Sequence, residues 1–350
     1  MPDWKSTTIG EVLSLQRGFD ITRAEQRPGS VPVVSSGGIS SYHDRAMIPG
    51  PGVVIGRKGT LGTTFYLPDD YWPHDTTLWV KDFKGSLPRF VYYFFVSLDV
   101  KRLDVGSANP TLNRNHVHPL PVRWPERSEQ ERIAAVLGAL DDKIAVNDRI
   151  SNTSFELAES SYKQLTARAT RSKPVGDLLD LRYGKALPTA DRVAGNISVY
   201  GSGGVTGRHD QALAAGPGII IGRKGTVGAV HWSEEDFFPI DTTFYVELRY
   251  AAMSMEFTFF MLRDLGLNTM NSDSAVPGLN RGNALALTVR LPGETDLQNF
   301  YKSVRPIFAL RQTLSAESVA LAELRGTLLP RLMSGAVRIR DAEKIVGEVS

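Results

Sequence analysis

The 350-residue sequence predicts an α+β protein with two tandem mixed α/β domains, separated by an antiparallel coiled coil of two long helices. The domains and helices are related by an internal pseudo-twofold repeat. Three observations predict this fold. The chain repeats itself at a long, constant offset, each copy begins with short apolar segments broken by turns, and each copy ends in a long stretch with helical periodicity.

The repeat is clearest in one eight-residue string. Residues 55–62 read IGRKGTLG and residues 221–228 read IGRKGTVG, so Gly56 and Gly222 are 222 − 56 = 166 positions apart. The same offset relates other glycines, two His-Asp pairs, a Gly-Pro-Gly turn and a D-T-T triplet: Gly10, Gly18, Gly37-Gly38, His43-Asp44, 50–52 and 75–77 recur at 176, 184, 203–204, 209–210, 216–218 and 241–243. A period this long indicates a duplicated domain rather than a solenoid.

Within each copy, apolar runs bounded by glycine and proline predict short strands, and aromatic-rich segments predict short helices. The expected strands are 31–34, 53–55, 78–80 and 244–246, and the expected short helices are 89–98 and 255–265.

Each copy is expected to end in a long helix. The first should begin at Ser128, with Glu131 completing a capping box, and end near residue 169; the second should begin at Thr295 and end at Pro330. An apolar stripe must be buried, and the simplest partner is the other copy's helix. The expected seam residues are Ile133, Leu137, Leu140 and Ile144, weakened at Asn147 and Ser151, and Leu310, Leu314, Leu321, Leu324 and Leu328.

These elements divide the chain into domains at 1–125 and 171–292, spacer helices at 126–170 and 293–337, and a charged, loosely ordered tail at 338–350.

The composition is that of a soluble globular protein, with 42% hydrophobic and 22% charged residues. No apolar run is long enough to span a membrane, and the N-terminus does not resemble a signal peptide. The chain has no cysteine, which excludes disulfides, thiol catalysis and cysteine-ligated zinc and is typical of a cytoplasmic protein. The net charge of +2 means that any strongly basic surface must be local.

The GRKGT loops place two cations between glycines, which suits close contact with a polyanion. The alternative is a solvated turn, but its repetition with both cations favours contact with phosphates or base edges. The loops do not have the spacing of a nucleotide-binding P-loop, and residues 201–207 do not fit a dinucleotide fingerprint.

The His-Asp pairs at 43–44, 74–75 and 209–210, with Asp241, are compatible with acid–base or metal chemistry. Ile240 replaces His74 in the second copy, and neither copy has carboxylates clustered at ligand spacing, so structural or DNA-contact roles are favoured. The D-T-T triplets predict turns with hydroxyls available to phosphates.

Two polar loops, 107–115 and 274–283, contain L-N-R at Leu112–Arg114 and Leu279–Arg281. Asparagine can read adenine and arginine can read guanine in the major groove. An ordinary surface loop is an equally open interpretation.

Taken together, the GRKGT-x-G loop, the D-T-T triplet, the P-x-L-N-R loop and the P-x-x-x-E-Q-E-R-I-A-A-V-L helix start resemble the specificity subunit of type I restriction–modification systems. The resemblance extends over both repeats, although the chain is short for the family. It implies two target recognition domains that read the halves of a bipartite, asymmetric DNA site, with the helices as a spacer.

The resemblance further implies a non-catalytic subunit that docks two modification (methyltransferase) subunits and, in full complexes, restriction subunits. No cofactor or metal is expected on this chain, because S-adenosylmethionine belongs to the modification subunit and ATP to the restriction subunit. The residues expected to contact double-stranded DNA are Ser36, Gly37, Gly38, Tyr42, His43, Arg57, Lys58, Thr60, Thr76, Thr77, Asn113, Arg114, Asn115, Ser202, Gly203, Gly204, Arg208, His209, Arg223, Lys224, Thr226, Thr242, Thr243, Asn280 and Arg281.

Two alternatives of other classes remain at this point. A duplicated DNA-acting enzyme, such as a nuclease or transferase, predicts turnover by the purified chain alone. An RNA- or protein-binding scaffold predicts that duplex DNA competes poorly.

Overall fold

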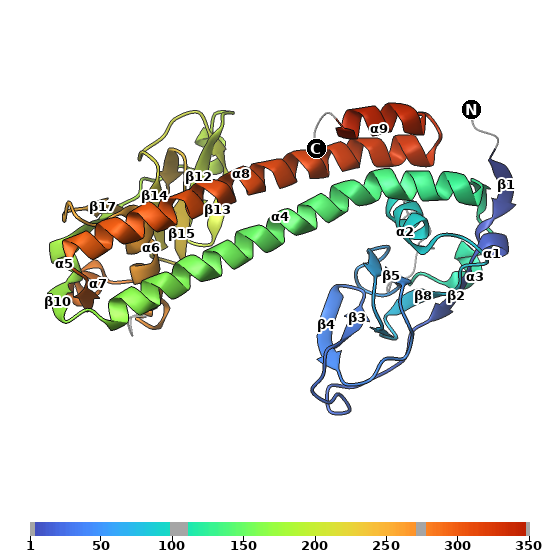
Figure 1. The fold of residues 1–350 in the computed structure, drawn as a ribbon, viewed down its shortest axis with the longest axis horizontal. Helices are drawn as coiled ribbons and strands as arrows, with labels where there is room; N and C mark the ends of the chain where they lie inside the picture. Colours follow the sequence, from blue (N-terminus) through green and yellow to red (C-terminus); the bar gives the residue numbers. More distant parts are fainter. Residues whose placement is uncertain (1–3, 99–110, 271–277, 348–350) are drawn as a thin grey trace. The chain divides into compact units, whose positions relative to one another are not determined.

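The computed structural model describes residues 4–98, 111–270 and 278–347, and Figure 1 shows its helices and strands. The chain forms two compact units. The first consists of Met1–Ala145 with Ser318–Ser350, and the second of Val146–Glu317. Each unit therefore combines one mixed α/β domain with parts of both long helices, and no described helix is both long and apolar enough to cross a bilayer.

The first unit contains a four-stranded sheet in the order β2-β8-β5-β6, a three-stranded sheet in the order β4-β3-β7 and a two-stranded ribbon, β1-β9. Its elements before the long helix are β1 Lys5–Thr8, α1 Ile9–Val12, β2 Ser14–Arg17, β3 Val31–Ser35, β4 Gly38–His43, β5 Gly52–Gly56, β6 Thr64–Leu67, β7 Trp72–Pro73, β8 Thr77–Asp82, α2 Pro88–Ser97, α3 Arg114–Val117 and β9 Pro121–Trp124.

The second unit repeats this topology, with sheets β11-β17-β14-β15 and β13-β12-β16 and the ribbon β10-β18. Its elements are β10 Arg171–Pro174, α5 Val175–Leu178, β11 Leu179–Tyr183, η2 Thr189–Asp191, β12 Ile197–Gly201, β13 Gly204–His209, β14 Gly218–Gly222, β15 Val230–Ser233, β16 Phe237–Pro239, β17 Thr243–Leu248, α6 Met255–Asp264, η3 Leu267–Thr269, α7 Arg281–Ala286 and β18 Thr288–Leu291.

The central strands β5 (GVVIG) and β14 (GIIIG) are buried along their whole length. Their continuous β-branched runs suit a strand that is covered on both faces. The aromatic faces of α2 and α6 contribute to the same cores, which include Phe90 and Phe95 in the first unit and Phe257 and Phe260 in the second. The strands and short helices predicted from apolar runs are thus confirmed.

The long helices are α4, Arg127–Ala167, and α8, Glu294–Met333. Both predicted N-caps were wrong. The carbonyl of Glu126 accepts from the Gln130 N–H, and that of Gly293 accepts from the Leu297 N–H, so Ser128 and Thr295 lie inside the first turns. Buried Gln130 fixes the start of α4 instead, because its side chain accepts from the Leu87 N–H and donates to the Pro125 carbonyl.

Within each unit, α4 and α8 pack together in antiparallel register. In the first unit Asp141 forms an ion pair with Arg325. In the second, the Asn147 amide donates to Glu317 at 2.7 Å and Arg311 donates to the Ser151 hydroxyl at 3.2 Å. The fold class predicted from the sequence is therefore confirmed, including the two packed helices and the polar positions in their seam.

One expected seam residue does not contribute to the packing. Leu310 is 40% exposed, whereas Val304 and Phe308 are buried. Arg311 lies on the packed side instead, with its guanidinium 4.0 Å from the centre of the Phe155 ring. Burial lowers the pKa of Arg311, and the positive charge of Arg263 lowers it further.

The C-terminal tail is not loosely ordered along its whole length. Residues Ile339–Gly347 form helix α9, which folds back along the end of α8 in the first unit (Figure 1). Ile339 and Ala342 are buried and join the core that contains Leu328 and Leu332. The amphipathic pattern of a short charged segment explains the difference, because three or four apolar residues at helical spacing are enough to dock it.

Candidate nucleic-acid interface

The GRKGT loop leaves the end of β5 in the first unit and the end of β14 in the second. The backbone N–H groups of Arg57 and Lys58 both donate to the Thr76 carbonyl, at 2.9 and 3.1 Å, and those of Arg223 and Lys224 donate to the Thr242 carbonyl at the same distances. The loop is thereby fastened to the D-T-T turn in each domain.

The glycines of the loop are required by its backbone. Gly59 and Gly62 have φ of 73° and 76°, in the region that favours glycine. A Cβ on Gly56 would lie 2.1 Å from the Thr60 carbonyl oxygen. Lys58 and Thr60 are exposed, as are Lys224 and Thr226, while Arg57 and Arg223 are half-buried. The loop therefore presents its lysine and threonine to solvent and keeps its arginine closer to the domain.

The structure brings the GRKGT and L-N-R motifs together. The Leu112 N–H donates to the Arg57 carbonyl at 2.9 Å, and the Leu279 N–H donates to the Arg223 carbonyl at 2.9 Å. Residues 107–110 and 274–277 of the polar loops lie outside the described residues.

Asn113 and Asn280 are helix N-caps. The Asn113 side chain accepts from the Asn115 N–H at 3.0 Å, and the Asn280 side chain accepts from the Asn283 N–H at 3.1 Å. Each amide oxygen thus caps α3 or α7, and the NH₂ groups remain as donors for a base edge. Arg114 and Asn115 are exposed at the start of α3.

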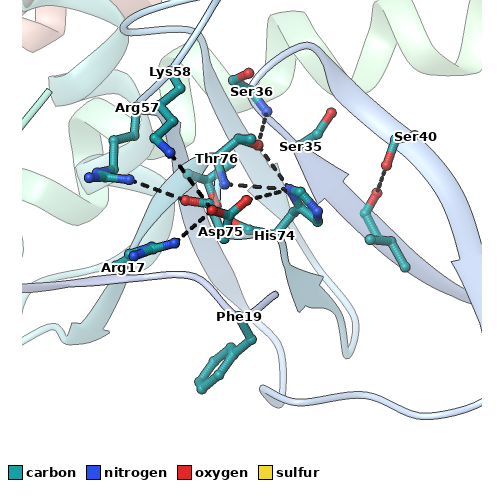
Figure 2. A network of polar contacts seen from close by, with 12 residues as sticks. Arg17, Phe19, Ser35, Ser36, Ser40, Arg57, Lys58, His74, Asp75 and Thr76 are labelled. Carbon is teal, nitrogen blue, oxygen red and sulfur yellow. Dashed lines mark hydrogen bonds and ion pairs between the residues drawn. The ribbon is translucent and has the colours of Figure 1, made fainter. Parts of the chain in front are cut away.

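In the first domain a single carboxylate organises the cations, as Figure 2 shows. Asp75 accepts from Arg17 at 2.7 Å, lies 4.0 Å from the Lys58 ammonium and lies 3.2 Å from the His74 imidazole. Partial burial opposes the ionisation of Asp75, but the hydrogen bond from Arg17 and the neighbouring positive charges lower its pKa. Asp75 is therefore a carboxylate at neutral pH and holds the cations in place.

Arg17 and Asp75 were not among the predicted contact residues. Arg17, Phe19, Arg57 and Arg114 line a hollow of about 670 Å³ between β2, the GRKGT loop and α3. The sequence feature that points to this part of the site is Gly18, which recurs as Gly184. A Cβ on Gly18 would lie 2.1 Å from the His74 carbonyl oxygen, because β2 passes close to the turn that carries Asp75.

Asp20, His74 and Asp75 have ligand atoms within 4.8 Å of one another. Arg17 already occupies one oxygen of Asp75, and Lys58 adds a second positive charge. These neighbours oppose the binding of a metal cation, since a cation would have to displace the guanidinium.

The second domain organises its cations differently. Tyr183 occupies the position of Arg17, and the Arg223 guanidinium lies 5.2 Å from the centre of its ring. A buried carboxylate in this domain, Asp180, has partners that differ from those of Asp75. It pairs with Arg281 and lies 3.0 Å from Arg249.

Arg281 is a positioning residue in this arrangement, because it bonds both Asp180 and the Leu181 carbonyl, the latter at 2.7 Å. It ties α7 to β11. Burial opposes the ionisation of Asp180, but the Leu181 N–H and the Arg281 guanidinium outweigh it and lower the pKa.

Replacing Asp180 by asparagine is expected to destabilise the protein by roughly 1.5–3 kcal/mol at neutral pH, the usual contribution of hydrogen bonds to charged groups. A carboxylate whose folded pKa is depressed stabilises above its unfolded pKa of about 3.9, and that contribution is lost as the pH falls through the folded value. Unfolding by denaturant, measured from pH 7 to pH 3, should show the gap between wild type and variant closing only at the acid end. The control is Asp241→Asn, since Asp241 is exposed and has no ion-pair partner among the described residues. An equal loss in both variants would contradict the role of Asp180.

Four predicted contact residues are instead structural. Thr77 and Thr243 are fully buried, and their hydroxyls donate to the His74 and Ile240 carbonyls at 2.7 and 2.8 Å. They close the D-T-T turns and offer no surface to a phosphate. His43 and His209 are also buried, where each imidazole accepts a backbone N–H from the preceding loop at 3.0 and 3.1 Å.

The other threonine of each triplet, Thr76 and Thr242, remains half-buried beside the loop. The Thr76 hydroxyl accepts from the Ser36 N–H at 3.3 Å, which brings the β3–β4 hairpin next to the GRKGT loop. Ser36, Gly37 and Gly38, with Ser202, Gly203 and Gly204, form the tips of equivalent hairpins. Tyr42 and Arg208 are exposed further along them.

Residues 1–153 match the family model "Type I restriction modification DNA specificity domain". This match confirms the resemblance predicted from the sequence motifs for the first domain and the first part of α4. No curated protein matches the sequence.

Among solved structures, the chain is similar to the type-I restriction-modification system S subunit from M. genitalium. The TM-score is 0.71 at 17% identity, over 94% of this chain and 96% of that chain, which establishes a shared fold. It also matches a structure from a study of type I R-M complex assembly and conformational transition, with a TM-score of 0.44, 14% identity and coverage of 95% and 98%. The HsdS subunit from Thermoanaerobacter tengcongensis matches with a TM-score of 0.35, 15% identity and coverage of 96% and 98%.

Proposed function

We propose that this chain is the sequence-specific DNA-recognition subunit of a type I restriction–modification complex, in which each domain reads one half of a bipartite, asymmetric site. The observation that carries the proposal is that a backbone hydrogen bond joins the GRKGT and L-N-R motifs in each domain. A cationic loop and the polar N-terminus of a short helix thus meet at one place, twice in the chain.

The roles of the side chains follow from their exposure. Lys58, Lys224 and Arg114 extend into solvent and suit phosphate oxygens, which position a protein on duplex DNA without reading its sequence. The domains organise their cations with different partners, Asp75 in one and Asp180 and Tyr183 in the other. Different surroundings for the same loop favour the reading of two different half-sites.

The proposed subunit is not itself an enzyme. Two similar domains offer two similar docking surfaces, so two copies of one modification subunit are the natural stoichiometry. In this proposal S-adenosylmethionine is bound by the modification subunits, and ATP by restriction subunits where these are present. Linking two modest half-site affinities in one chain raises the total affinity through effective concentration.

The test is selection from a pool of duplexes with randomised sequence, followed by sequencing of the bound fraction. We expect two short motifs separated by a spacer of fixed length. A bound fraction as random as the input would contradict the proposal. RNA competing better than duplex DNA would favour an RNA-binding scaffold, and DNA cleavage or modification by the chain alone would favour a duplicated enzyme.

Each domain should recognise its half-site independently. Replacing residues 1–125 with the matching domain of a relative is expected to change one selected motif completely and leave the other unchanged, because each domain has its own core. The reciprocal replacement of residues 171–292 is the matched control and should change only the other motif. Selection of two new motifs by either chimaera would show that the domains read the site jointly.

A further inference from the structure

The tip of each β3–β4-type hairpin carries a glycine that the fold itself does not need. Among the described residues, a Cβ added to Gly37 would meet no atom within 4 Å, and one added to Gly203 would meet only the Thr226 hydroxyl, at 3.6 Å. Neither residue has φ in the left-handed region, in contrast to Gly38 and Gly204, with φ of 116° and 111°. Both copies nevertheless have glycine there, and a tip without a side chain leaves room for a ligand to approach the backbone closely.

Some of the remaining hairpin residues are identical in the two copies, whereas several exposed residues differ between them. Ser36, both glycines and the buried histidine at the end of β4 are identical in the two copies. The exposed positions differ: Ile39, Ser40 and Tyr42 stand where the second copy has Val205, Thr206 and Arg208. The two hairpins share their pairing, including a register shift at the same place. The same backbone therefore presents different exposed side chains.

Two of these exposed side chains are apolar. Ile39 is 54% exposed and Val205 is 58% exposed, directly after the glycine pair in each hairpin. A single exposed aliphatic residue needs no explanation. Here the same position is aliphatic and exposed in both copies, beside a cationic loop.

The hairpin tip touches the GRKGT loop in both domains. A Cβ on Gly59 would lie 3.7 Å from the Ser36 hydroxyl, and a Cβ on Gly225 would lie 3.2 Å from the Ser202 hydroxyl. A phosphate held by Lys58 or Lys224 would therefore bring the duplex against the hairpin tip. Because the GRKGT loop is positively charged, the ligand expected next to the hairpin tip is a polyanion.

We infer that the β3–β4 and β12–β13 hairpins enter the major groove of the DNA, that Gly37 and Gly203 allow their tips to approach the bases, and that Ile39 and Val205 are specificity-determining residues. The major groove of B-DNA is wide enough for a two-stranded ribbon. It also displays the thymine methyl group, which an aliphatic side chain recognises by apolar contact. Tyr42 and Arg208, further along β4 and β13, add the polar contacts in which the two half-sites differ. The inference rests on the proposed function and assigns the reading of bases within it.

The glycines are tested with Gly37→Ala and Gly37→Leu in the full chain. The alanine variant should unfold at the wild-type temperature because its Cβ has open space, and measuring the same temperature for the leucine variant separates any loss of folding from a loss of binding. Their affinity for the selected duplex should fall by about tenfold or more, with a larger loss for leucine, since one disturbed base pair costs about 1–3 kcal/mol, or about 5- to 150-fold. Gly326→Ala in α8 is the matched control, because a Cβ there also meets nothing within 4 Å. Wild-type affinity of both Gly37 variants for the selected duplex would overturn the inference.

The aliphatic residues are tested with Ile39→Ser and Val205→Ser, using selection from the same randomised pool. Ile39→Ser should lose the preference for a T·A pair at one position of one motif, and Val205→Ser should do so in the other motif. The slope of affinity against salt should stay unchanged, since no phosphate contact is lost. Unchanged motifs in both variants would overturn the inference while leaving the proposed function intact. A wild-type chain that selects no motif would instead overturn the proposed function.

Discussion

Replacing Arg57, Lys58, Arg223 and Lys224 together by alanine is expected to lower the affinity for every duplex, specific or random, by about 10³-fold at 0.1 M salt. Each phosphate contact contributes about 0.9 to the slope of log affinity against log salt, so four lost contacts would make that slope shallower by about three to four. The loss should be nearly independent of sequence, because phosphates carry no sequence information directly.

The structure also predicts how this effect divides among the four cations. Lys58 and Lys224 are exposed, whereas Arg57 is half-buried beside Asp75, and burial together with the charge of Arg17 lowers its pKa. The double variant of the two lysines alone should therefore account for about two charges of the slope. A loss confined to one motif in an arginine variant would show that the arginine reads a base.

The matched control removes exposed cations that lie outside the loops. Arg127 and Lys163 lie on α4, paired with Glu131 at 2.9 Å and with Glu159 at 2.9 Å. Their double alanine variant should leave both affinity and salt slope close to wild type. If this control weakened binding as much as the loop variants, the GRKGT loops would not be the principal phosphate contacts.

Lengthening both long helices by one heptad is expected to change the preferred spacer between the two motifs by about three base pairs. Seven helical residues add about 10 Å, and B-DNA rises about 3.4 Å per base pair. The insertions belong between Asn147 and Ser151 and between Arg311 and Glu317, so that both polar pairs of the seam are kept. Ala158 is a poor position because it is buried in the core of the second unit.

Affinity should fall as the spacer lengthens, since three base pairs also turn the duplex by roughly 100°, whereas a heptad in a coiled coil turns little. The measurement is binding to duplexes with the same two motifs and graded spacers. Inserting a single residue in each helix is the control: it displaces the apolar stripe from the seam and should lower stability without defining a new spacer. A heptad variant that still prefers the original spacer would show that the helices do not set the distance.

The sequence predicted best what depends on repetition and local pattern. The GRKGT loops, the buried strands before them and the aromatic short helices follow from apolar runs bounded by glycine. The helix starts at Ser128 and Thr295 were wrong because the capping pattern also fits residues inside a first turn. In α4 the tertiary contacts of Gln130 fix the start. The prediction that Leu310 lies in the seam was wrong for a similar reason, because a leucine repeat does not reveal that Arg311 takes the place of an apolar residue on the packed side.

The pairing of charges could not be predicted from the sequence. Asp75 and Arg17 are separated by 58 positions, and Asp180 and Arg281 by 101. No local pattern in the sequence indicates that Asp75 pairs with cations in the first domain and Asp180 in the second. The role of Tyr183, at the position of Arg17 in the first copy, could not be predicted either, because it depends on the Arg223 guanidinium lying over the tyrosine ring.

The two-stranded ribbons β1–β9 and β10–β18 pair the first and last strands of each domain, so a whole domain can be replaced between two neighbouring points of the chain. Lys5 lies opposite Trp124 in the β1–β9 ribbon, and Arg171 lies opposite Leu291 in the β10–β18 ribbon, so the chain enters and leaves each domain at neighbouring points. A recombination event that joins a foreign domain at these two points has to match only a pair of adjacent strand ends. If each domain reads one half-site as proposed, a single exchange of this kind would change one sequence preference and leave the long helices unaltered.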